Sequence, residues 1–316
     1  MKVLIVANHN TGSFTSFVVE QVDALKHIGV EVDFYGIHGK GIRGYLSNYP
    51  ALKAKIRDYK PDLIHAHYGL SGLLANLQRA IPVVTTYHGS DIHSMGLNLF
   101  LSRIAMKLSA YNIFVSRGLQ EISGYHGNNL SIIPCGVDIS VFYQIERAKA
   151  RKVLGWDNDG KYVLFAGAFD NEVKNSKLAI GVISYIPNAH LVELRGYSRE
   201  QVNLVINASN CLLMTSFNEG SPVIIKEAMA CGTPVVSVNV GDVKELIAGI
   251  DGCYITSFET KAIVNSLNKA LTYYGRTQGR NYIIERELSN EQLVKKLISV
   301  YQVVNNRNIK QHQSRL

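Results

Sequence analysis

Cysteine is scarce in this sequence, and its four residues lie far apart without a Cys-x-x-Cys pair. That spacing predicts neither a disulfide framework nor a zinc knuckle, so we expect buried thiols. The cysteines are Cys135, Cys211, Cys231 and Cys253. Long apolar runs are absent as well, since no segment approaches the roughly 20 residues needed to cross a bilayer. The apolar start at residues 2–7 is too short for a signal peptide, which predicts a first core strand and a cytoplasmic protein.

Acidic residues are outnumbered by basic ones, 25 to 33, which gives a formal net charge of +8. This charge suits anionic partners such as a nucleotide diphosphate or the acidic inner surface of a membrane. The sequence has neither an aromatic-and-basic RNA motif nor a helix-turn-helix pattern, so we expect no nucleic-acid partner. The chain of 316 residues, 47% of them hydrophobic, has room for two domains of roughly 150 residues.

The most informative stretch runs from residue 211 to 246. Its apolar start, 211–215, is typical of a buried parallel strand, and the β-branched run at 235–238 predicts the next one. Between them, Ser221 is a plausible N-cap and Pro222 suits the first position of a helix. The loop and helix start would place free N–H groups at the carboxyl edge of the sheet, where phosphate binds. The residues predicted to bind there are Gly220, Ser221, Pro222 and Val223.

Two glutamates flank this corner. Glu219 precedes the glycine of the loop, whereas Glu227 lies well into the helix, roughly 7 Å along its axis at about 1.5 Å per residue. A carboxylate so close to a diphosphate would repel it unless it points at hydroxyl groups. We therefore predict that Glu227 accepts hydrogen bonds from a ribose and that Glu219 contacts a sugar carried on the phosphate. Surface acids beside an ordinary strand and helix are the alternative.

The paired glutamates, with EGSP, KEAMACGTPVV and GDVKE around them, resemble the retaining glycosyltransferases of family 4, which have the GT-B fold. TYHGSD at 86–91 and IIPCGVD at 132–138 extend the resemblance over nearly the whole chain. It implies an α/β fold of two Rossmann-like, doubly wound parallel-sheet domains facing a central cleft. It also implies that a sugar moves, with retention, from a nucleotide-diphosphate sugar to a saccharide or lipid-linked acceptor in cell-surface polysaccharide or glycan synthesis. No cofactor is implied beyond this co-substrate.

The amino-terminal half opens as a βαβ unit with Gly12 at its first turn, where a backbone approaches a ligand or the turn alone needs glycine. The resemblance places this loop on the acceptor side, with His67 and Asp91. It also places His88 beside the reacting sugar as a catalytic residue, with a packed structural histidine as the alternative. No Cys, Asp or Glu completes a ligand set with His65 and His67, so we predict no zinc.

Two other segments match the letters of a binding motif but stand at the wrong place in the chain for it. Residues 39–44 spell Gly-x-Gly-x-x-Gly, but the nicotinamide fingerprint must follow the first strand and open into a helix. This segment follows the second strand, so we predict a flexible basic loop. Residues 157–159 spell Asp-x-Asp, a metal-binding pattern of other glycosyltransferases. Because they precede the first strand of their domain, we predict a turn and a metal-independent enzyme.

In the carboxy-terminal half, the β-rich run 161–166 ends at Gly167. Many family members carry an arginine directly after this glycine and a lysine further on, both on the diphosphate. Here position 168 is alanine, whereas Lys174 matches the lysine. The resemblance thus implies that Lys174 stabilises the leaving diphosphate and that the Gly167 backbone lies near it. Lys177 and Arg195 are further donor-binding candidates, with solvated surface side chains as the alternative.

The domain boundaries follow from these segments. We predict a first domain at 1–143, a linker at 144–152, a second domain at 153–289, a helix at 290–306 that crosses back to the first domain, and a polar, disordered tail at 307–316. The amphipathic helix at 97–110 predicts an ordinary covering helix or a peripheral membrane contact. Two other functions remain open, a GT-B sugar-nucleotide epimerase and a non-catalytic nucleotide-sugar-binding subunit.

Overall fold

The computed structural model describes residues 1–93 and 96–313, with side chains as far as residue 307. The chain divides into two compact units, Met1–Cys135 with Asn290–Leu316, and Gly136–Ser289. In the described residues, each unit has one parallel sheet, of six strands in the first and five in the second. Each sheet has a hydrophobic core on both faces. That arrangement is typical of parallel α/β sheets, whose helices cover both faces.

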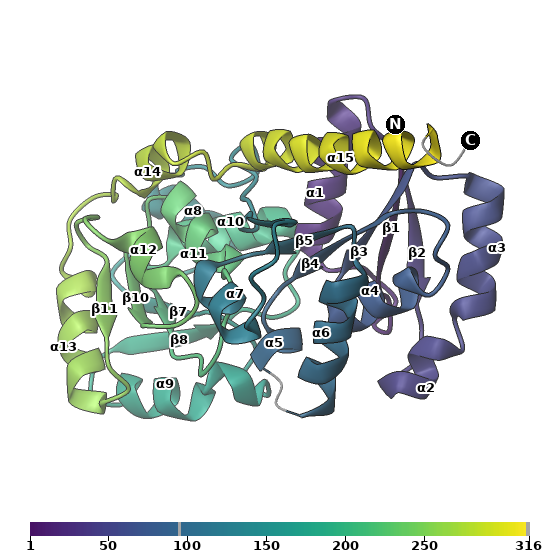
Figure 1. Cartoon of the computed structure of the whole chain (residues 1–316). Helices are drawn as coiled ribbons and strands as arrows, with labels where there is room; N and C mark the ends of the chain where they lie inside the picture. Colours follow the sequence, from purple (N-terminus) through teal and green to yellow (C-terminus); the bar gives the residue numbers. More distant parts are fainter. Residues whose placement is uncertain (94–95, 314–316) are drawn as a thin grey trace. The chain divides into compact units, whose positions relative to one another are not determined.

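The first unit carries the strand order β2-β1-β3-β4-β5-β6 (Figure 1). Its strands are β1 (Lys2–Asn8), β2 (Glu31–Ile37), β3 (Leu63–His67), β4 (Val83–Tyr87), β5 (Tyr111–Phe114) and β6 (Leu130–Ile132). Its helices are α1 (Ser16–His27), α2 (Gly41–Leu46), α3 (Tyr49–Tyr59), α4 (Gly69–Asn76), α5 (Ser90–His93), α6 (Leu97–Leu108), α7 (Arg117–Ser123) and α15 (Asn290–Gln313).

The apolar run of β1 is continuous because both of its faces are covered. Val3 and Ile5 belong to one core, and Leu4 and Val6 belong to the core on the opposite face. A strand alternates its side chains between faces, so a strand buried on both sides has no polar positions in its middle.

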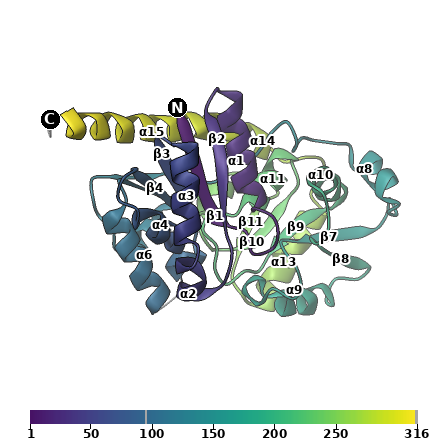
Figure 2. The ribbon, with the colours of Figure 1, turned by 90° about the vertical axis from the view of Figure 1, so that its right-hand side faces the viewer.

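The last helix, α15, completes the first unit. It lies beside α1, as two views at right angles show (Figures 1 and 2). Leu293, Leu297 and Tyr301 from α15 join the same core as Val3 and Ile5 of β1. The amphipathic pattern at the end of the chain therefore serves the first unit, because its apolar face covers that sheet.

The second unit carries the strand order β11-β10-β9-β7-β8. Its strands are β7 (Lys161–Phe165), β8 (Ala189–Glu193), β9 (Cys211–Met214), β10 (Val235–Val238) and β11 (Tyr254–Thr256). Its helices are α8 (Arg147–Leu154), the short 3₁₀ helix η1 (Glu172–Lys174), α9 (Ser176–Ile183), α10 (Arg199–Ala208), α11 (Val223–Ala230), α12 (Val243–Ile247), α13 (Thr260–Leu271) and α14 (Gly279–Glu285).

Each sheet reverses its winding at one place. In the first unit the chain leaves β1 toward β2 on one side and then builds β3 on the other. In the second unit it leaves β7 toward β8 and then builds β9 on the other side. Loops at the carboxyl ends of two such strands diverge and leave room for a ligand. The topology therefore points to the ends of β1 and β3, and of β7 and β9, as ligand-binding edges.

Three boundary predictions differ from the structure. The units divide after Cys135, ahead of the predicted end at residue 143. The predicted linker at 144–152 is largely the helix α8, in which buried Arg151 donates to the Ala208 carbonyl at 2.9 Å and to Asn210 Oδ1 at 2.7 Å. The predicted disordered tail is helical as far as Gln313, and its remainder, 314–316, lies outside the described residues.

The segment 39–44 was predicted as a flexible loop, but Gly41–Leu46 forms the helix α2. A Cβ on Gly39 would lie 2.9 Å from the Gly44 Cα atom. The two glycines are therefore explained by close backbone packing within this segment.

Candidate functional site

At the switch point of the second sheet, an ion pair joins the loops after β7 and β9. Lys174 Nζ lies 2.7 Å from Glu219 Oε1, and the two side chains are 23% and 14% exposed. A Cβ on Gly167 would lie 2.8 Å from Lys174 Cγ, so glycine there lets the lysine stem pass. The sequence predicted all three residues as parts of one site, and the structure brings them together.

The start of α11 follows directly on this ion pair. Pro222 occupies the N-cap position and offers no side-chain cap. The Ser221 hydroxyl accepts a hydrogen bond from Lys226 Nζ at 2.6 Å and donates one to Asp242 Oδ2 at 2.5 Å. The predicted N-cap role of Ser221 is therefore wrong, because its hydroxyl serves two charged side chains instead. The first N–H groups of a helix have no partner inside it, so α11 presents donors at its positive end.

Glu227 lies on α11 and is almost fully buried. Its Oε1 is 2.5 Å from Arg199 Nη2, and the side chains of Glu227 and Arg199 are 4% and 30% exposed. The Arg199 guanidinium also lies over the Phe142 ring, 4.6 Å from its centroid. Arg199 is not predictable from the sequence, because it lies 28 residues from Glu227 and looks like any surface residue at a helix start. A hydroxyl bound by Glu227 would share the carboxylate with this guanidinium.

Two predicted donor-binding residues lie apart from this cluster. Arg195 is about half exposed and pairs with Asp170, with its Nη2 atom 2.5 Å from Asp170 Oδ1. Lys177 is exposed on α9. The structure thus places Glu219 in the loop between β9 and α11 and Glu227 on α11, and it pairs Lys174 of η1 with Glu219.

In the first unit, a pocket of about 460 Å³ opens where β1, β3 and β4 end. Most of its lining side chains end in hydroxyl or amide groups, and none of its lining residues is lysine or arginine. These polar residues include Asn8, Thr11, Ser13, Tyr45, Ser90 and Asn98. Gly12 lies between two of them with a φ of +79°, and a Cβ there would meet nothing within 4 Å. The left-handed turn, more than a close approach, explains this glycine.

Next to this pocket, buried His67 and partly buried His88 form a chain of contacts with Cys135. His67 Nδ1 lies 2.9 Å from His88 Nε2, so that one ring donates to the other, and His88 Nδ1 lies 3.6 Å from Cys135 Sγ. Burial lowers the pKa of His67 to about 3, and burial beside His67 lowers the pKa of His88 well below its ordinary value. Both rings are therefore neutral at pH 7, and His88 offers polarity without charge.

Asp91 and Tyr68 shape the rim of this pocket. The Asp91 carboxylate accepts backbone hydrogen bonds from Gly69 at 2.9 Å, Gly89 at 2.9 Å and His88 at 3.1 Å. It therefore ties the loop after β3 to the loop after β4. Tyr68 has a φ of +73° and its ring centroid lies 4.7 Å from that of His88. A positive φ is strained for tyrosine, and such strain is concentrated at functional sites.

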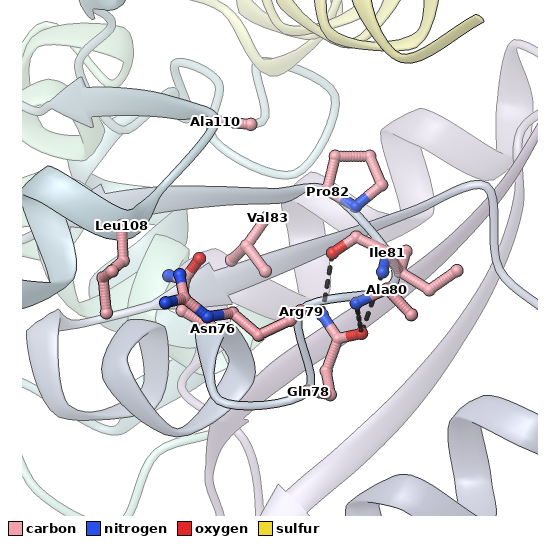
Figure 3. Close-up of a pocket in the computed structure, with 9 residues that line it drawn as sticks. All are labelled: Asn76, Gln78, Arg79, Ala80, Ile81, Pro82, Val83, Leu108 and Ala110. Carbon is pink, nitrogen blue, oxygen red and sulfur yellow. Dashed lines mark hydrogen bonds between the residues drawn. The ribbon is translucent and has the colours of Figure 1, made fainter. Parts of the chain in front are cut away.

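A second pocket lies at the other edge of the first sheet. Gln78 closes the turn before β4, where its amide accepts from the Ala80 and Ile81 N–H groups and donates to the Ile81 carbonyl (Figure 3). This turn precedes the amino end of β4, whereas ligands of doubly wound sheets bind at carboxyl ends. The Gln78 contacts therefore account for a stable turn.

Among residues 1–93 and 96–307, no three His, Cys, Asp or Glu side chains cluster as they would around a metal ion. The helices in the described part of the chain are all too short or too polar to traverse a bilayer.

The buried histidines predict a pH-dependent stability. Burial lowers the pKa of His65 well below its ordinary value of 6.5, and it lowers the pKa of His67 to about 3. As pH falls through 6.5, the unfolded chain binds protons that the folded chain excludes, so the free energy of unfolding falls. Below that pH each histidine removes about 1.4 kcal/mol per pH unit. Thermal unfolding between pH 7.5 and 5 should show this loss.

The matched variant for this prediction is His67→Asn, which keeps a polar side chain that does not titrate. Below pH 6.5 its free energy of unfolding should fall less steeply than that of the wild type, because the unfolded variant binds one proton fewer. Parallel pH curves for the two proteins would contradict the assignment.

Two doubly wound parallel units are the architecture of the GT-B fold, and known structures agree. Sucrose-phosphate synthase from Thermosynechococcus elongatus superposes with a TM-score of 0.82 at 16% identity, over 96% of this chain and 99% of that one. Anabaena HepE, solved in complex with UDP, gives a TM-score of 0.66 at 18% identity over 100% of both chains. This is a GT-B protein.

Two family models match the chain. The model described as Glycosyltransferase Family 4 matches residues 2–141, and the model described as Glycosyl transferases group 1 matches residues 163–273. Together they cover most of the chain, with one match in each unit. The chain belongs to the family 4 glycosyltransferases of the GT-B fold.

Curated relatives are closer in sequence than these solved structures. The putative teichuronic acid biosynthesis glycosyltransferase TuaC of Bacillus subtilis is 28% identical in an alignment of 247 residues that covers 68% of this chain and 62% of TuaC. A D-inositol 3-phosphate glycosyltransferase of Mycolicibacterium gilvum is 24% identical over 69% of this chain and 60% of its own length. The chain thus spans about three fifths of the curated relatives it matches.

Proposed function

We propose that this protein is a retaining, metal-independent glycosyltransferase. It moves a sugar from a nucleotide-diphosphate sugar to a saccharide or lipid-linked acceptor in the synthesis of a cell-surface polysaccharide or another glycan. The observation that carries the proposal is the Lys174–Glu219 ion pair beside the start of α11, at the switch point of the second sheet. Family membership, and the nucleotide complexes of structural neighbours such as HepE, support a nucleotide-sugar donor.

In the proposed reaction, the bond between the sugar C1 and the phosphate oxygen breaks, and the acceptor oxygen bonds to C1 on the same face. The acceptor proton passes to the leaving diphosphate, so that no covalent sugar-enzyme intermediate forms. Lys174 and the N–H groups at the start of α11 stabilise the charge that develops on the leaving diphosphate. Glu219 holds the Lys174 ammonium at 2.7 Å before the donor binds. Once the donor is bound, the Glu219 carboxylate contacts the hydroxyls of the donor sugar.

The pocket of the first unit supplies the acceptor side of the proposal. Its hydroxyl and amide side chains, among them Asn8, Thr11 and Tyr45, can exchange hydrogen bonds with a sugar. Neutral His88 lies beside it and assists the reacting hydroxyl by polarity. The proposed reaction therefore needs an acceptor, whereas the reaction of an epimerase does not.

The decisive experiment is a thermal-shift screen of nucleoside diphosphates and their sugars, followed by turnover assays with the stabilising donor. We expect one nucleotide to stabilise the protein and turnover to need a saccharide acceptor. The same assay in EDTA should keep its activity. Donor turnover without acceptor, with free nucleotide as an intermediate, would establish an epimerase. Binding without any turnover would establish a non-catalytic subunit. Full loss in EDTA with recovery in Mg²⁺ or Mn²⁺ would overturn metal independence.

Glu227 provides a further prediction. If its carboxylate accepts hydrogen bonds from the donor ribose, Glu227→Ala removes charge-assisted bonds worth roughly 1.5–3 kcal/mol, or about 10- to 150-fold in nucleotide affinity. The loss should be much smaller for a 2′,3′-dideoxy nucleotide, which lacks the hydroxyls. Calorimetric titration of both ligands measures the difference.

The control for Glu227 must account for Arg199, which the mutation also leaves without this partner. Arg199→Met removes the same ion pair and keeps the carboxylate. We expect Arg199→Met to discriminate the two nucleotides as the wild type does. Equal affinity losses for ribose and dideoxy ligands in a folded Glu227→Ala protein would contradict the ribose assignment.

We further propose a peripheral contact of α6 with the inner membrane surface. Leu97 and Phe100 on this helix are 58% and 60% exposed, and Arg103 and Lys107 are exposed on it as well. An apolar edge beside basic side chains suits an anionic lipid surface. The wild type should sediment with phosphatidylglycerol vesicles, whereas the Phe100→Ser variant should stay in the supernatant. Equal sedimentation with phosphatidylcholine vesicles alone, or an unchanged Phe100→Ser, would contradict the contact.

A further inference from the structure

A lysine is completely buried at the start of α11. Lys226 has 0% of its surface exposed, although it carries an ammonium group. Its side chain runs back toward the start of the helix, where Nζ donates to Ser221 Oγ at 2.6 Å and to the Ser221 carbonyl at 3.4 Å. Long helical side chains lean this way. The ammonium thus lies beside the segment proposed to bind the donor diphosphate.

The hydrogen-bond directions in this cluster are fixed by chemistry. An ammonium group only donates, so Ser221 Oγ accepts from Lys226. A serine has one hydroxyl proton, and Ser221 gives it to Asp242 Oδ2 at 2.5 Å. Lys226, Ser221 and Asp242 therefore form a relay in which a buried positive charge and a negative charge share one hydroxyl. No hydroxyl proton is left on Ser221 for a phosphate.

The relay holds two loops against each other. Asp242 follows Gly241, and a Cβ on Gly241 would lie 2.7 Å from the Gly220 carbonyl oxygen. The loop before α12 is therefore packed directly on the loop before α11. Asp242 Oδ1 is buried and, within the described residues, has no hydrogen-bond partner. One carboxylate oxygen thus holds Ser221 while the other stays without a bond.

Stability alone does not explain this lysine. A cation at the positive end of a helix is unfavourable, and burial of a charge adds a desolvation cost. Replacement of a buried ion pair by apolar residues of similar size is often neutral or stabilising. A group that is costly in the empty protein becomes favourable when an anion binds next to it. A diphosphate at the start of α11 would be such an anion.

We propose that Lys226 is a positioning residue for the donor diphosphate. Its ammonium charge attracts the diphosphate to the start of α11, holds Ser221 in place and is balanced by Asp242 until the donor binds. The proposal rests on the proposed function of this corner. Its consequence is that the two charges of the relay have opposite effects on diphosphate affinity. Removal of Lys226 leaves an uncompensated negative charge near the phosphates, whereas neutralisation of Asp242 leaves a positive one.

The test is calorimetric titration of UDP and UMP, or of the adenine pair if the thermal-shift screen selects adenine. Lys226→Met should lower diphosphate affinity roughly tenfold, the effect of one charge about 10 Å away at an effective dielectric constant near 20. The loss should be smaller for the monophosphate. Asp242→Asn, which can still accept from Ser221, should raise diphosphate affinity by a similar factor. The double variant should lie close to the wild type.

Three controls make the result decisive. Lys244→Met removes an exposed lysine of α12 and should leave both affinities unchanged. If Lys226→Met does not fold, the comparison of Asp242→Asn with Lys226→Met/Asp242→Asn still isolates the lysine charge, and the double variant should bind diphosphate more weakly. Thermal unfolding of each variant shows whether stability and affinity move together.

A merely structural relay would make both single variants less stable and weaken both ligands alike, which would overturn the inference. Lower diphosphate affinity in Asp242→Asn would overturn it as well. A wild type that binds neither nucleotide would remove the proposed function itself, and this inference with it.

Discussion

Lys174→Met is expected to lower turnover by about 10²- to 10³-fold, which is the typical cost of losing one group aimed at charge that develops in the transition state. Lys174 is placed for this role because η1 and the Gly167 turn bring its Nζ atom to the switch point, 2.7 Å from Glu219. Ground-state affinity for the nucleotide diphosphate should fall much less than turnover. Steady-state kinetics with saturating donor, alongside calorimetry, separates the two quantities.

Two comparisons make this result specific to the lysine charge. Lys174→Arg keeps a positive group and should recover part of the lost turnover. Lys161→Met removes an exposed lysine at the opposite end of the same strand, β7, and should have no effect. Lys174→Met and Lys161→Met proteins with equal activity would show that Lys174 does not act on the leaving group.

His88→Ala is expected to lower turnover by roughly 10²- to 10⁴-fold, the range for general acid–base or polar assistance. Nucleotide affinity should stay nearly unchanged, because His88 belongs to the first unit and the proposed nucleotide site to the second. Burial beside His67 keeps the pKa of His88 well below 6.5. The ring is then neutral at every pH above 6.5, so its protonation should not appear in the pH dependence of kcat from pH 6.5 to 8.

The control for His88 is Cys135→Ser, which changes a neighbour of the same ring and leaves the imidazole in place. It should keep most of the turnover. Equal losses of turnover and nucleotide binding in His88→Ala would show a packing role instead. Turnover restored at low temperature, where the variant refolds, would show the same. Such a result would favour the packed-histidine alternative that the sequence left open.

The elements of the fold were predictable because their signals are local. β1 is a continuous apolar run since both of its faces are covered, and β9 and β10 are recognisable in the same way. The boundary between the units was less predictable. The high charge of the α8 sequence predicts a linker, and only the contacts of Arg151 with Ala208 and Asn210 reveal that this helix packs on the second unit.

The candidate site divides in the same way. The resemblance to family 4 predicted Gly167 and Lys174, and Glu219 was predicted from its place in the loop after an apolar strand. In a parallel sheet all carboxyl ends lie at one edge, so these loops lie on the same side of the sheet. Lys226 carries a signal in the sequence, because it and Glu227 are the two charges in the otherwise apolar α11. Its partner Asp242 and the hydroxyl of Ser221 could be joined to it only once two loops were packed together.

The sequence by itself determined the parallel α/β class, the two-domain organisation, the family and the loops that form the candidate site. Each depends on residues close in the chain, whose spacing fixes which strand, turn or helix forms. The tertiary structure decided the partners, including Arg199 with Glu227, Lys174 with Glu219 and His67 with His88. Those pairs join residues 21 to 45 positions apart, and the burial that lowers the pKa of His67 and of His88 exists only after the sheets are covered.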